Sequence, residues 1–295
     1  MTVLSTSQLH KTYGNITAVN QLSLEVEAGN IYGILGPNGS GKTTTLGMVL
    51  GIIQPDGGTF QWFEGKYGNN HRRHLGALLE TPNFYPYLSA LKNLEIVAEI
   101  KKVKNPDLLP ILDMVGLLER AKYKFSGYSL GMKQRLAIAA AMVGDPDVLI
   151  FDEPANGLDP QGIAEIRHTI QRIGEMGKTI IMSSHILDEV EKVCTHVCII
   201  KNGNLLATGP IGAILSNDVL IEVNADNVEA LRTLFGEKRF VRQMQDIETG
   251  GLLLTVDEEI QPRQLNRMAF DSGIELSHLR ERKLSLEEEF LEITK

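Results

Sequence analysis

IYGILGPNGSGKTTTLGMVL, residues 31–50, joins a short apolar run to a glycine-rich loop and then to a segment with helical spacing. The apolar run at 31–35 predicts a buried strand, and the spacing of the apolar residues in 46–50 predicts a helix. Between them, GPNGSGKT fits the pattern G-x-x-x-x-G-K-[ST], in the order of strand, loop and helix that a phosphate-binding loop requires. The stretch therefore predicts a phosphate loop in an α/β fold.

A loop of this kind binds phosphates mainly with its backbone. Glycines allow successive N–H groups to converge on an anion, and the helix that follows adds the positive end of its dipole. The Lys42 ammonium can reach the β- and γ-phosphates, and the Thr43 hydroxyl can ligate Mg²⁺. We interpret the loop as a nucleotide triphosphate site; the alternative is a glycine-rich turn that only caps a helix. The residues predicted to bind the nucleotide here are Gly36, Pro37, Asn38, Gly39, Ser40, Gly41, Lys42, Thr43 and Thr44.

Composition limits the class of protein. The chain has 295 residues, of which 43% are hydrophobic and 22% charged, which is a globular composition and enough chain for two domains. A net charge of −8 argues against nucleic acid as a partner, because duplex binding depends on a basic face. The sequence holds no apolar run of the roughly 18 residues that a membrane span needs, and its start lacks the apolar core of a signal peptide. We therefore expect a cytoplasmic protein.

The two cysteines, Cys194 and Cys198, are too few for a disulfide framework. With His196 they form the pattern C-x-H-x-C, which permits a metal site. The surrounding stretch THVCII is typical of a buried strand, so we favour thiols packed in the core over metal ligands.

Strands alternate with helices through the first two thirds of the chain, which predicts a parallel sheet with right-handed crossovers. The apolar run at 147–151 ends in Asp152 and Glu153, and the strand at 178–183 is followed by His185. Ligands of such sheets bind at the carboxyl ends of the strands. Lys42, Asp152, Glu153 and His185 are therefore expected at one edge.

Three further segments complete the predicted fold. Residues 1–30 alternate polar and apolar residues, as half-buried antiparallel strands do. A helical subdomain is expected at about 83–143, inserted in an ATP-binding domain that spans 1–215. Residues 216–295 read as strand, helix, strand, helix, strand, which predicts a small α+β accessory domain of split βαβ type. The fold class is thus an α/β phosphate-loop core with an antiparallel β subdomain, a helical insert and a C-terminal α+β domain.

Five motifs in this order resemble the ATP-binding subunit of an ABC transporter over about residues 3–210. Beside the phosphate loop they are YSLGMKQR at 128–135, LIFDEP at 149–154, GLDP at 157–160 and His185. The resemblance implies an ATPase with ATP and Mg²⁺ as cofactors. The form of YSLGMKQR, the NGLDP turn and the C-terminal domain are similar to exporters of the bacitracin-resistance and lantibiotic-immunity type, which implies export of a peptide, antibiotic or lipid-like substrate.

The strand-end residues take their roles from both chemistry and the resemblance. Asp152 can hold Mg²⁺, and Glu153 is placed to orient or deprotonate the attacking water. His185 resembles the histidine that contacts the γ-phosphate, so Glu153, His185 and Lys42 are the expected catalytic residues. Tyr13 resembles the aromatic residue that stacks on adenine, and its alternative is a loop tyrosine that covers the core.

The motif at 128–135 resembles the family signature, which closes on ATP held by a second subunit. Ser129, Gly131 and Gln134 would then contact the partner's nucleotide, and Asp159 would support the interface. One phosphate loop and one signature in the chain imply two such subunits around two ATPs. The resemblance also implies separate polytopic membrane permease subunits, and hence a peripheral place on the inner face of the cell membrane.

Two departures from the family pattern stand out. The signature has Leu130 and Met132 where Gly and Gln are commoner, and Glu80 stands where the family usually has Gln. Glu80 could ligate Mg²⁺ through oxygen, but it adds negative charge beside the triphosphate.

Because the signature is altered, a regulatory nucleotide-binding module with little turnover is an alternative function. Non-transport ATPases that act on nucleic acid or the ribosome are another alternative, although the heptads, basic faces or second core typical of those proteins are absent from the sequence.

A loop segment rich in aromatic residues follows Glu80: TPNFYPYL at 81–88 contains Phe84, Tyr85 and Tyr87. We consider two interpretations. The segment is either a local apolar pack under the helical subdomain or a groove that receives a cytoplasmic helix of the membrane subunit.

Overall fold

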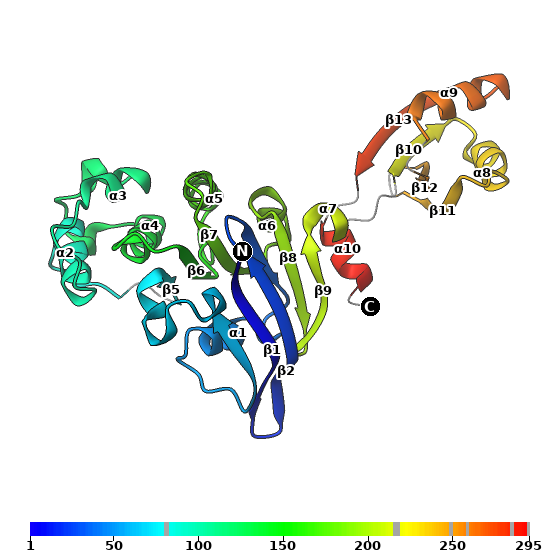
Figure 1. The fold of residues 1–295 in the computed structure, drawn as a ribbon. Coiled ribbons are helices and arrows are strands. Elements are labelled where there is room, and N and C mark those ends of the chain that lie inside the picture. Colours follow the sequence, from blue (N-terminus) through cyan, green and yellow to red (C-terminus); the bar gives the residue numbers. More distant parts are fainter. Residues whose placement is uncertain (80–82, 215–218, 248–249, 258–259, 284–285, 294–295) are drawn as a thin grey trace. The chain divides into compact units, whose positions relative to one another are not determined.

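The computed structural model describes the chain except residues 80–82, 215–218, 248–249, 258–259, 284–285 and 294–295 (Figure 1). Its contacts divide it into two compact units, Met1–Ile211 and Gly212–Ile293, which are described separately below. Within the described residues, no helix combines the length and the apolar character that crossing a membrane requires.

A six-stranded sheet forms the centre of the first unit, with strand order β5-β6-β7-β3-β8-β9. The strands from β5 to β8 in this order are parallel, as predicted, and β9 closes the edge antiparallel to β8. The most central strands are buried at every residue, because helices and a second sheet cover both faces. The strands are β3 (Ile31–Leu35), β5 (Leu75–Leu78), β6 (Val148–Asp152), β7 (Thr179–Ser184), β8 (His196–Lys201) and β9 (Asn204–Pro210).

An antiparallel sheet of three strands, in the order β2-β1-β4, packs beside this core. Its strands are β1 (Thr2–Tyr13), β2 (Ile16–Glu27) and β4 (Gly57–Trp62). Apolar side chains on one face, such as Leu9 and Leu22, join residues of β3 and α1 in one hydrophobic cluster. The predicted half-buried strands are thereby confirmed, and they carry one wall of the site described below.

The helices of this unit are α1 (Lys42–Val49), α2 (Ala90–Ile100), α3 (Leu109–Met114), α4 (Leu130–Met142), α5 (Pro160–Glu175) and α6 (Leu187–Val193). A short helix, α7 (Ile211–Ile214), spans the division between the units. Short 3₁₀ segments occur at Phe63–Gly65, Gly68–His74, Leu118–Arg120 and Phe125–Gly127. Helices α2, α3 and α4 make up the helical insert (Figure 1).

One helix is shorter than its periodicity predicted. Apolar residues recur at helical spacing over 107–122, which predicts a continuous helix, but α3 ends at Met114. Gly116 has a φ of +66°, and the Leu117 N–H donates to the Leu112 carbonyl at 2.7 Å. This is the left-handed glycine cap that terminates many helices.

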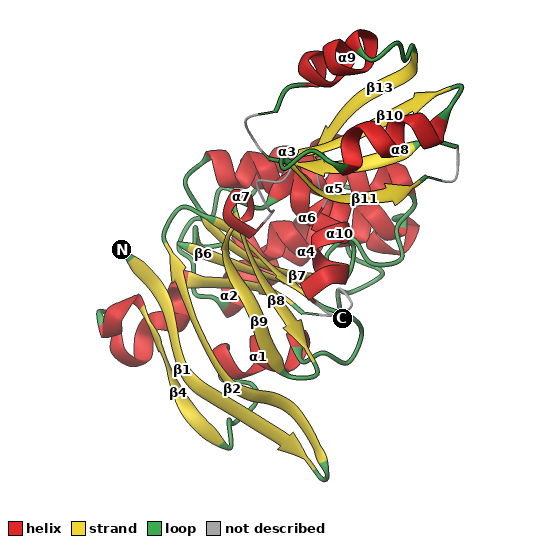
Figure 2. Ribbon diagram, turned by 90° about the vertical axis from the view of Figure 1, so that its right-hand side faces the viewer, coloured by secondary structure: helices red, strands yellow, loops and turns green. Residues whose placement is uncertain are grey.

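The second unit has the order strand-helix-strand-strand-helix-strand, and its four strands form an antiparallel sheet in the order β11-β12-β10-β13. The elements are β10 (Val219–Ala225), α8 (Val228–Gly236), β11 (Val241–Asp246), β12 (Leu252–Val256), α9 (Pro262–Asp271), β13 (Leu276–Lys283) and a final helix, α10 (Leu286–Ile293). Helices α8 and α9 contribute Leu231, Phe235 and Leu265 to the core of the sheet. Both helices are labelled in Figure 2.

The expected sequence of elements in this unit missed β11. Its sequence, VRQMQD, is mostly polar, and only Val241 and Met244 pack against the core. An edge strand needs little apolar surface, so the alternation that reveals a half-buried strand is absent here.

Candidate functional site

The carboxyl ends of β3, β6 and β7 meet at one edge of the central sheet, because these strands are neighbours and parallel. A cavity of about 380 Å³ opens there, within the range of 300–1,000 Å³ common for ligand pockets. Its lining includes residues from the phosphate loop, the β1–β2 hairpin and the strand ends: Tyr13, Ala18, Asn38, Gly39, Gly41, Lys42, Thr43, Thr44, Glu153, Asn156 and His185. Gly36, Pro37 and Ser40 belong to the loop but not to this lining.

Two positions in the loop require glycine. Gly41 has a φ of +108°, and a Cβ there would collide with the Ala18 carbonyl oxygen. A Cβ on Gly36 would collide with the Ile200 carbonyl oxygen. The loop is therefore held tightly between neighbouring backbone segments, which leaves its N–H groups at the start of α1 in fixed positions.

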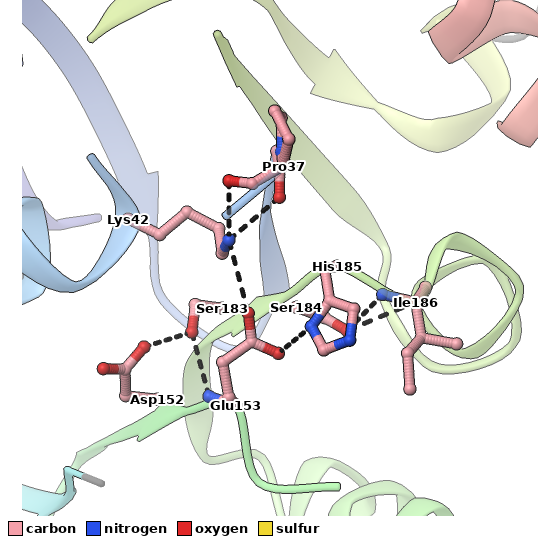
Figure 3. Close-up of polar contacts among 9 residues, drawn as sticks. Pro37, Lys42, Asp152, Glu153, Ser183, Ser184, His185 and Ile186 are labelled. Carbon is pink, nitrogen blue, oxygen red and sulfur yellow. Dashed lines mark hydrogen bonds and ion pairs between the residues drawn. The ribbon is translucent and has the colours of Figure 1, made fainter. Parts of the chain in front are cut away.

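The Lys42 ammonium is at the centre of the site and is 5% exposed. It donates to the Gly36 carbonyl at 2.8 Å and to the Pro37 carbonyl at 3.2 Å. Its nitrogen is also 3.3 Å from Glu153 Oε1, as Figure 3 shows. A fixed cation beside a set of loop amides is suited to bind an anion such as a phosphate.

The Glu153 side chain contacts both Lys42 of the phosphate loop and His185, which follows β7. Its Oε2 is 2.7 Å from His185 Nδ1, so the carboxylate lies between an ammonium and an imidazole (Figure 3). The Glu153 backbone has a φ of +49°, which directs the side chain away from that of Asp152. Two adjacent carboxylates thus have different partners and different surroundings.

Ser183 links the Asp152 carboxylate to the Glu153 backbone, a role that the sequence interpretation missed. Its hydroxyl donates to Asp152 Oδ1 and accepts the Glu153 N–H at 2.9 Å. Asp152 and Ser183 are register partners in β6 and β7, so the contact follows from the parallel pairing of the strands. A serine that ends a strand beside an acidic strand end is the signal that could have identified it. Asn156, on the cavity wall, was also missed.

Asp152 and Thr43 are placed differently with respect to the cavity. The Asp152 side chain is 4% exposed and does not line it, whereas Thr43 is exposed on the wall at the start of α1. Both offer oxygen atoms of the kind that Mg²⁺ prefers. Glu80, the third predicted metal ligand, lies outside the described residues.

Tyr13 lines the cavity from the end of β1 and is 49% exposed. The Lys11 ammonium is 5.5 Å from the centre of its ring. The ring thus presents much of its surface to the cavity and to solvent rather than covering the core, which leaves it free to stack on a flat base.

The signature residues lie apart from the phosphate loop. Ser129, Gly131 and Asp159 line a second cavity of about 410 Å³, which shares no lining residue with the first. Ser129 Oγ accepts the Met132 N–H at 3.2 Å and Asp159 Oδ1 accepts the Gly162 N–H at 2.8 Å, so both residues cap helices. Gln134 is buried in α4, lines neither cavity, and its Oε1 has no hydrogen-bond partner among the described residues.

The cysteine thiols are in the core. Burial raises the pKa of Cys194 and of Cys198 to about 12. The His196 ring stacks on Tyr32, with the ring centres 4.7 Å apart. In the part of the chain that the structure describes, no group of His, Cys, Asp and Glu residues has the arrangement of a metal site.

The aromatic segment after residue 82 is divided between core and surface. Phe84 packs edge-on against Phe125, with 5.2 Å between ring centres, whereas Tyr85 and Tyr87 are 50% and 65% exposed. Phe84 and Tyr85 line a groove of about 340 Å³ with Ile96, Val97 and Ile100 of α2.

A parallel sheet whose strand ends bring together a phosphate loop, a lysine and two carboxylates defines a phosphate-loop nucleotide hydrolase. The family described as "ABC transporter" matches residues 19–156. The chain is 36% identical to the bacitracin transport ATP-binding protein BcrA of Bacillus licheniformis, over 99% of this chain and 97% of that protein. It is also 36% identical to the lantibiotic transport ATP-binding protein SrtF of Streptococcus pyogenes, over 80% of this chain and 97% of SrtF.

Solved structures of ATP-binding subunits of ABC transporters have a similar fold. An ATP-binding subunit of an ABC transporter superposes with a TM-score of 0.63 at 27% identity, over 72% of this chain and 91% of that one. A dimeric post-hydrolysis state of the ATP-binding cassette MJ0796, bound to ADP and Pi, superposes with a TM-score of 0.62 at 25% identity, over 70% of this chain and 98% of that one. The chain belongs to the ATP-binding subunits of ABC transporters, and it is an ATPase whose hydrolysis is coupled to transport.

Proposed function

We propose that this chain powers the export of a peptide antibiotic through separate membrane subunits. The observation that carries the proposal is the full-length similarity to the bacitracin transport ATP-binding protein of Bacillus licheniformis, which includes the second unit. The similarity to a lantibiotic transport ATP-binding protein supports the same class of cargo. Residues 212–293 would be an accessory domain of this exporter type.

Hydrolysis would proceed by in-line attack of water on the γ-phosphate. The loop amides and Lys42 would bind the phosphates, and Glu153 would orient the water or accept its proton. His185 holds the Glu153 carboxylate at 2.7 Å and would contact the γ-phosphate as charge develops there. Tyr13 would stack on the adenine.

The residues present also fit a magnesium ion. Thr43 and Asp152 would hold it, with Glu80 as a third oxygen ligand, and the bound ion would neutralise charge on the β- and γ-phosphates. Ser183 fixes the Asp152 carboxylate for this task. Glu80 adds negative charge beside the triphosphate, so closure of the site would depend more strongly on the metal. Glu80→Gln should therefore retain ATPase activity and lower the Mg²⁺ concentration needed for half-maximal rate. An unchanged Mg²⁺ titration would contradict a role for Glu80 at the metal.

The active form would be a dimer in which Ser129 and Gly131 complete the partner's nucleotide site and Asp159 supports the interface, whereas Gln134 is buried in α4 and would not take part as expected. Two observations support it. The signature cavity is separate from the nucleotide cavity within one chain, and a solved relative is a dimeric cassette bound to ADP and Pi. The Ser129 cap leaves N–H groups of α4 at its N-terminus, which is a place for an anion.

The membrane subunit would dock at the groove formed by Phe84, Tyr85 and α2, and the chain would then lie on the inner face of the membrane. The exposed tyrosines beside the groove support this assignment, because exposed aromatic side chains commonly anchor partners.

Two measurements test the proposal. Affinity purification of the tagged chain from native membranes should recover a polytopic membrane protein, identified by mass spectrometry. Cells that lack the chromosomal copy should become sensitive to bacitracin or a lantibiotic. The wild-type gene should restore resistance, and Glu153→Gln should not. Recovery of ribosomes or nucleic-acid complexes instead, with unchanged resistance, would refute the export proposal.

A further inference from the structure

The turn between β8 and β9, residues 201–204, supports the phosphate loop from outside the site. The Gly203 N–H donates to the Ser40 carbonyl at 2.9 Å, and the Asn20 N–H donates to the Gly203 carbonyl at 2.8 Å. Gly203 therefore connects the phosphate loop to β2 through both of its backbone polar groups. Ser40 is 1% exposed, so its carbonyl depends on this partner within the protein.

The Ala18 carbonyl lies between this turn and the loop. A Cβ on Gly203 would be 2.9 Å from the Ala18 oxygen, and a Cβ on Gly41 would collide with the same oxygen. Ala18 itself lines the nucleotide cavity. A glycine of the loop and a glycine of the turn thus pack against one carbonyl, and any shift of the turn is transmitted directly to the loop.

Side chains hold the turn in this position. Lys201 pairs with Asn204 across a two-residue turn, in which Asn202 and Gly203 have φ angles of +50° and +78°. Asn20 Nδ2 donates to Asn204 Oδ1 at 2.9 Å, and Asn204 Nδ2 donates to the Asn202 carbonyl at 3.1 Å. Asn-Gly is the preferred pair for such a hairpin.

We infer that Gly203 is a positioning residue for nucleotide binding, which acts through Ser40 to fix the backbone of the phosphate loop. Anion binding by backbone amides depends on their geometry, so a loop displaced by a fraction of an ångström loses affinity for phosphates. The inference rests on the proposed nucleotide site at this loop, and it assigns a function to a turn whose residues are not part of the cavity lining.

The test is the affinity of the full-length chain for ADP with Mg²⁺, measured by titration calorimetry. Gly203→Ala should bind ADP about tenfold more weakly, because its Cβ displaces the turn. Gly29→Ala is the matched control: Gly29 has the same φ of +78°, but a Cβ there would meet no atom within 4 Å. The backbone strain is alike in the two variants, and only Gly203 contacts the loop. Gly29→Ala should bind ADP as the wild type does.

Steady-state kinetics provide a readout that a merely structural role would not change. Loss of ground-state binding raises KM for ATP, whereas kcat at saturating ATP should stay within about twofold of the wild type. Equal ADP affinity in Gly203→Ala and wild type, or equal weakening in both glycine variants, would overturn the inference.

A second variant covers the case in which Gly203→Ala does not fold. Asn204→Ala removes the two hydrogen bonds of the Asn204 side chain described above and adds no atoms, and it should weaken ADP binding about threefold. Unchanged affinity in Asn204→Ala would then overturn the inference. Absence of ADP binding by the wild type itself would instead refute the nucleotide site, and the positioning role with it.

Discussion

Glu153 Oε1 lies 3.3 Å from Lys42 Nζ, so the carboxylate proposed to activate water is paired with the ammonium proposed to bind phosphate. The same carboxylate is also held by His185. In the proposed mechanism an incoming triphosphate would compete with Glu153 for Lys42, and the displaced carboxylate would stay beside the γ-phosphate. The ion pair would then oppose binding while keeping the proposed base in place.

Glu153→Gln should separate these two effects. An amide cannot accept the proton of water, so kcat should fall by at least a hundredfold, within the range typical of general-base loss. Removing an ion pair of about 1 kcal/mol should tighten ATP binding roughly fivefold. Phosphate release and calorimetry measure the two quantities. Asp145→Asn, which neutralises a surface partner of Lys178, should change neither. Near-normal turnover in Glu153→Gln would refute the assignment of the base.

Ser183→Ala should disturb the Asp152 carboxylate and the Glu153 backbone at once. It leaves Asp152 Oδ1 and the Glu153 N–H without their buried partner, which costs about 1–3 kcal/mol of stability, and it should lower kcat at least tenfold. Thr179→Val is the control on the same strand, since it removes a buried hydroxyl that accepts the Gly29 N–H. Both variants should lower the melting temperature, but only Ser183→Ala should require more Mg²⁺. If Ser183→Ala and Thr179→Val lose the same stability and keep the same ATPase activity, the proposed role of Ser183 at the two acidic residues is contradicted.

The exposed Tyr87 offers a test of the membrane-subunit groove. Tyr87→Glu should leave the ATPase activity and melting temperature of the isolated chain unchanged, because the side chain is 65% exposed. Transport in cells should be lost, since a charge would be buried at the contact. The Tyr87 ring lies 5.9 Å from that of Tyr85, which lines the groove. Tyr123 is 56% exposed and does not line the groove, so Tyr123→Glu should transport normally. Insoluble Tyr87→Glu protein would support the alternative of a local apolar pack.

Alkylation tests the core position of the thiols. With a pKa of about 12 for both cysteines, only about one thiol in ten thousand is ionised at pH 8, and the thiolate is the reactive form. Iodoacetamide should label neither Cys194 nor Cys198 in the folded chain, and both after unfolding in guanidinium. Mass spectrometry counts the labels. Zinc-dependent protection that persists after unfolding would favour the C-x-H-x-C metal interpretation instead.

The sequence predicted those parts of the structure that depend on local pattern. The strand, loop and helix at 31–50 follow from apolar spacing and glycines, and the gathering of Lys42, Glu153 and His185 follows from the rule that parallel strands end at one edge. The bond from Ser183 to Asp152 was not predictable, because it depends on which residues face each other between β6 and β7. The positive φ of Glu153 is likewise held by tertiary contacts rather than by its own preference.

Two elements differ from the prediction: the helix expected over 107–122 is shorter, and the strand β11 was missed. Periodicity alone cannot show that Gly116 stops α3, because the apolar pattern continues past it. The strand β11 carries too few apolar residues to stand out from a loop. The end of α3 is thus marked by a local glycine cap that the apolar pattern obscures, whereas β11 is defined by its pairing with β12.

The separation of the two cavities on one chain has a genetic consequence. In the proposed dimer, each ATP lies between the phosphate loop of one chain and the signature helix of the other, so a chain altered at Ser129 damages its partner's site while its own loop stays intact. When altered and normal chains are made in equal amounts, random pairing leaves only about a quarter of the dimers with two intact sites. A signature allele should therefore reduce resistance even in cells that carry a normal copy of the gene.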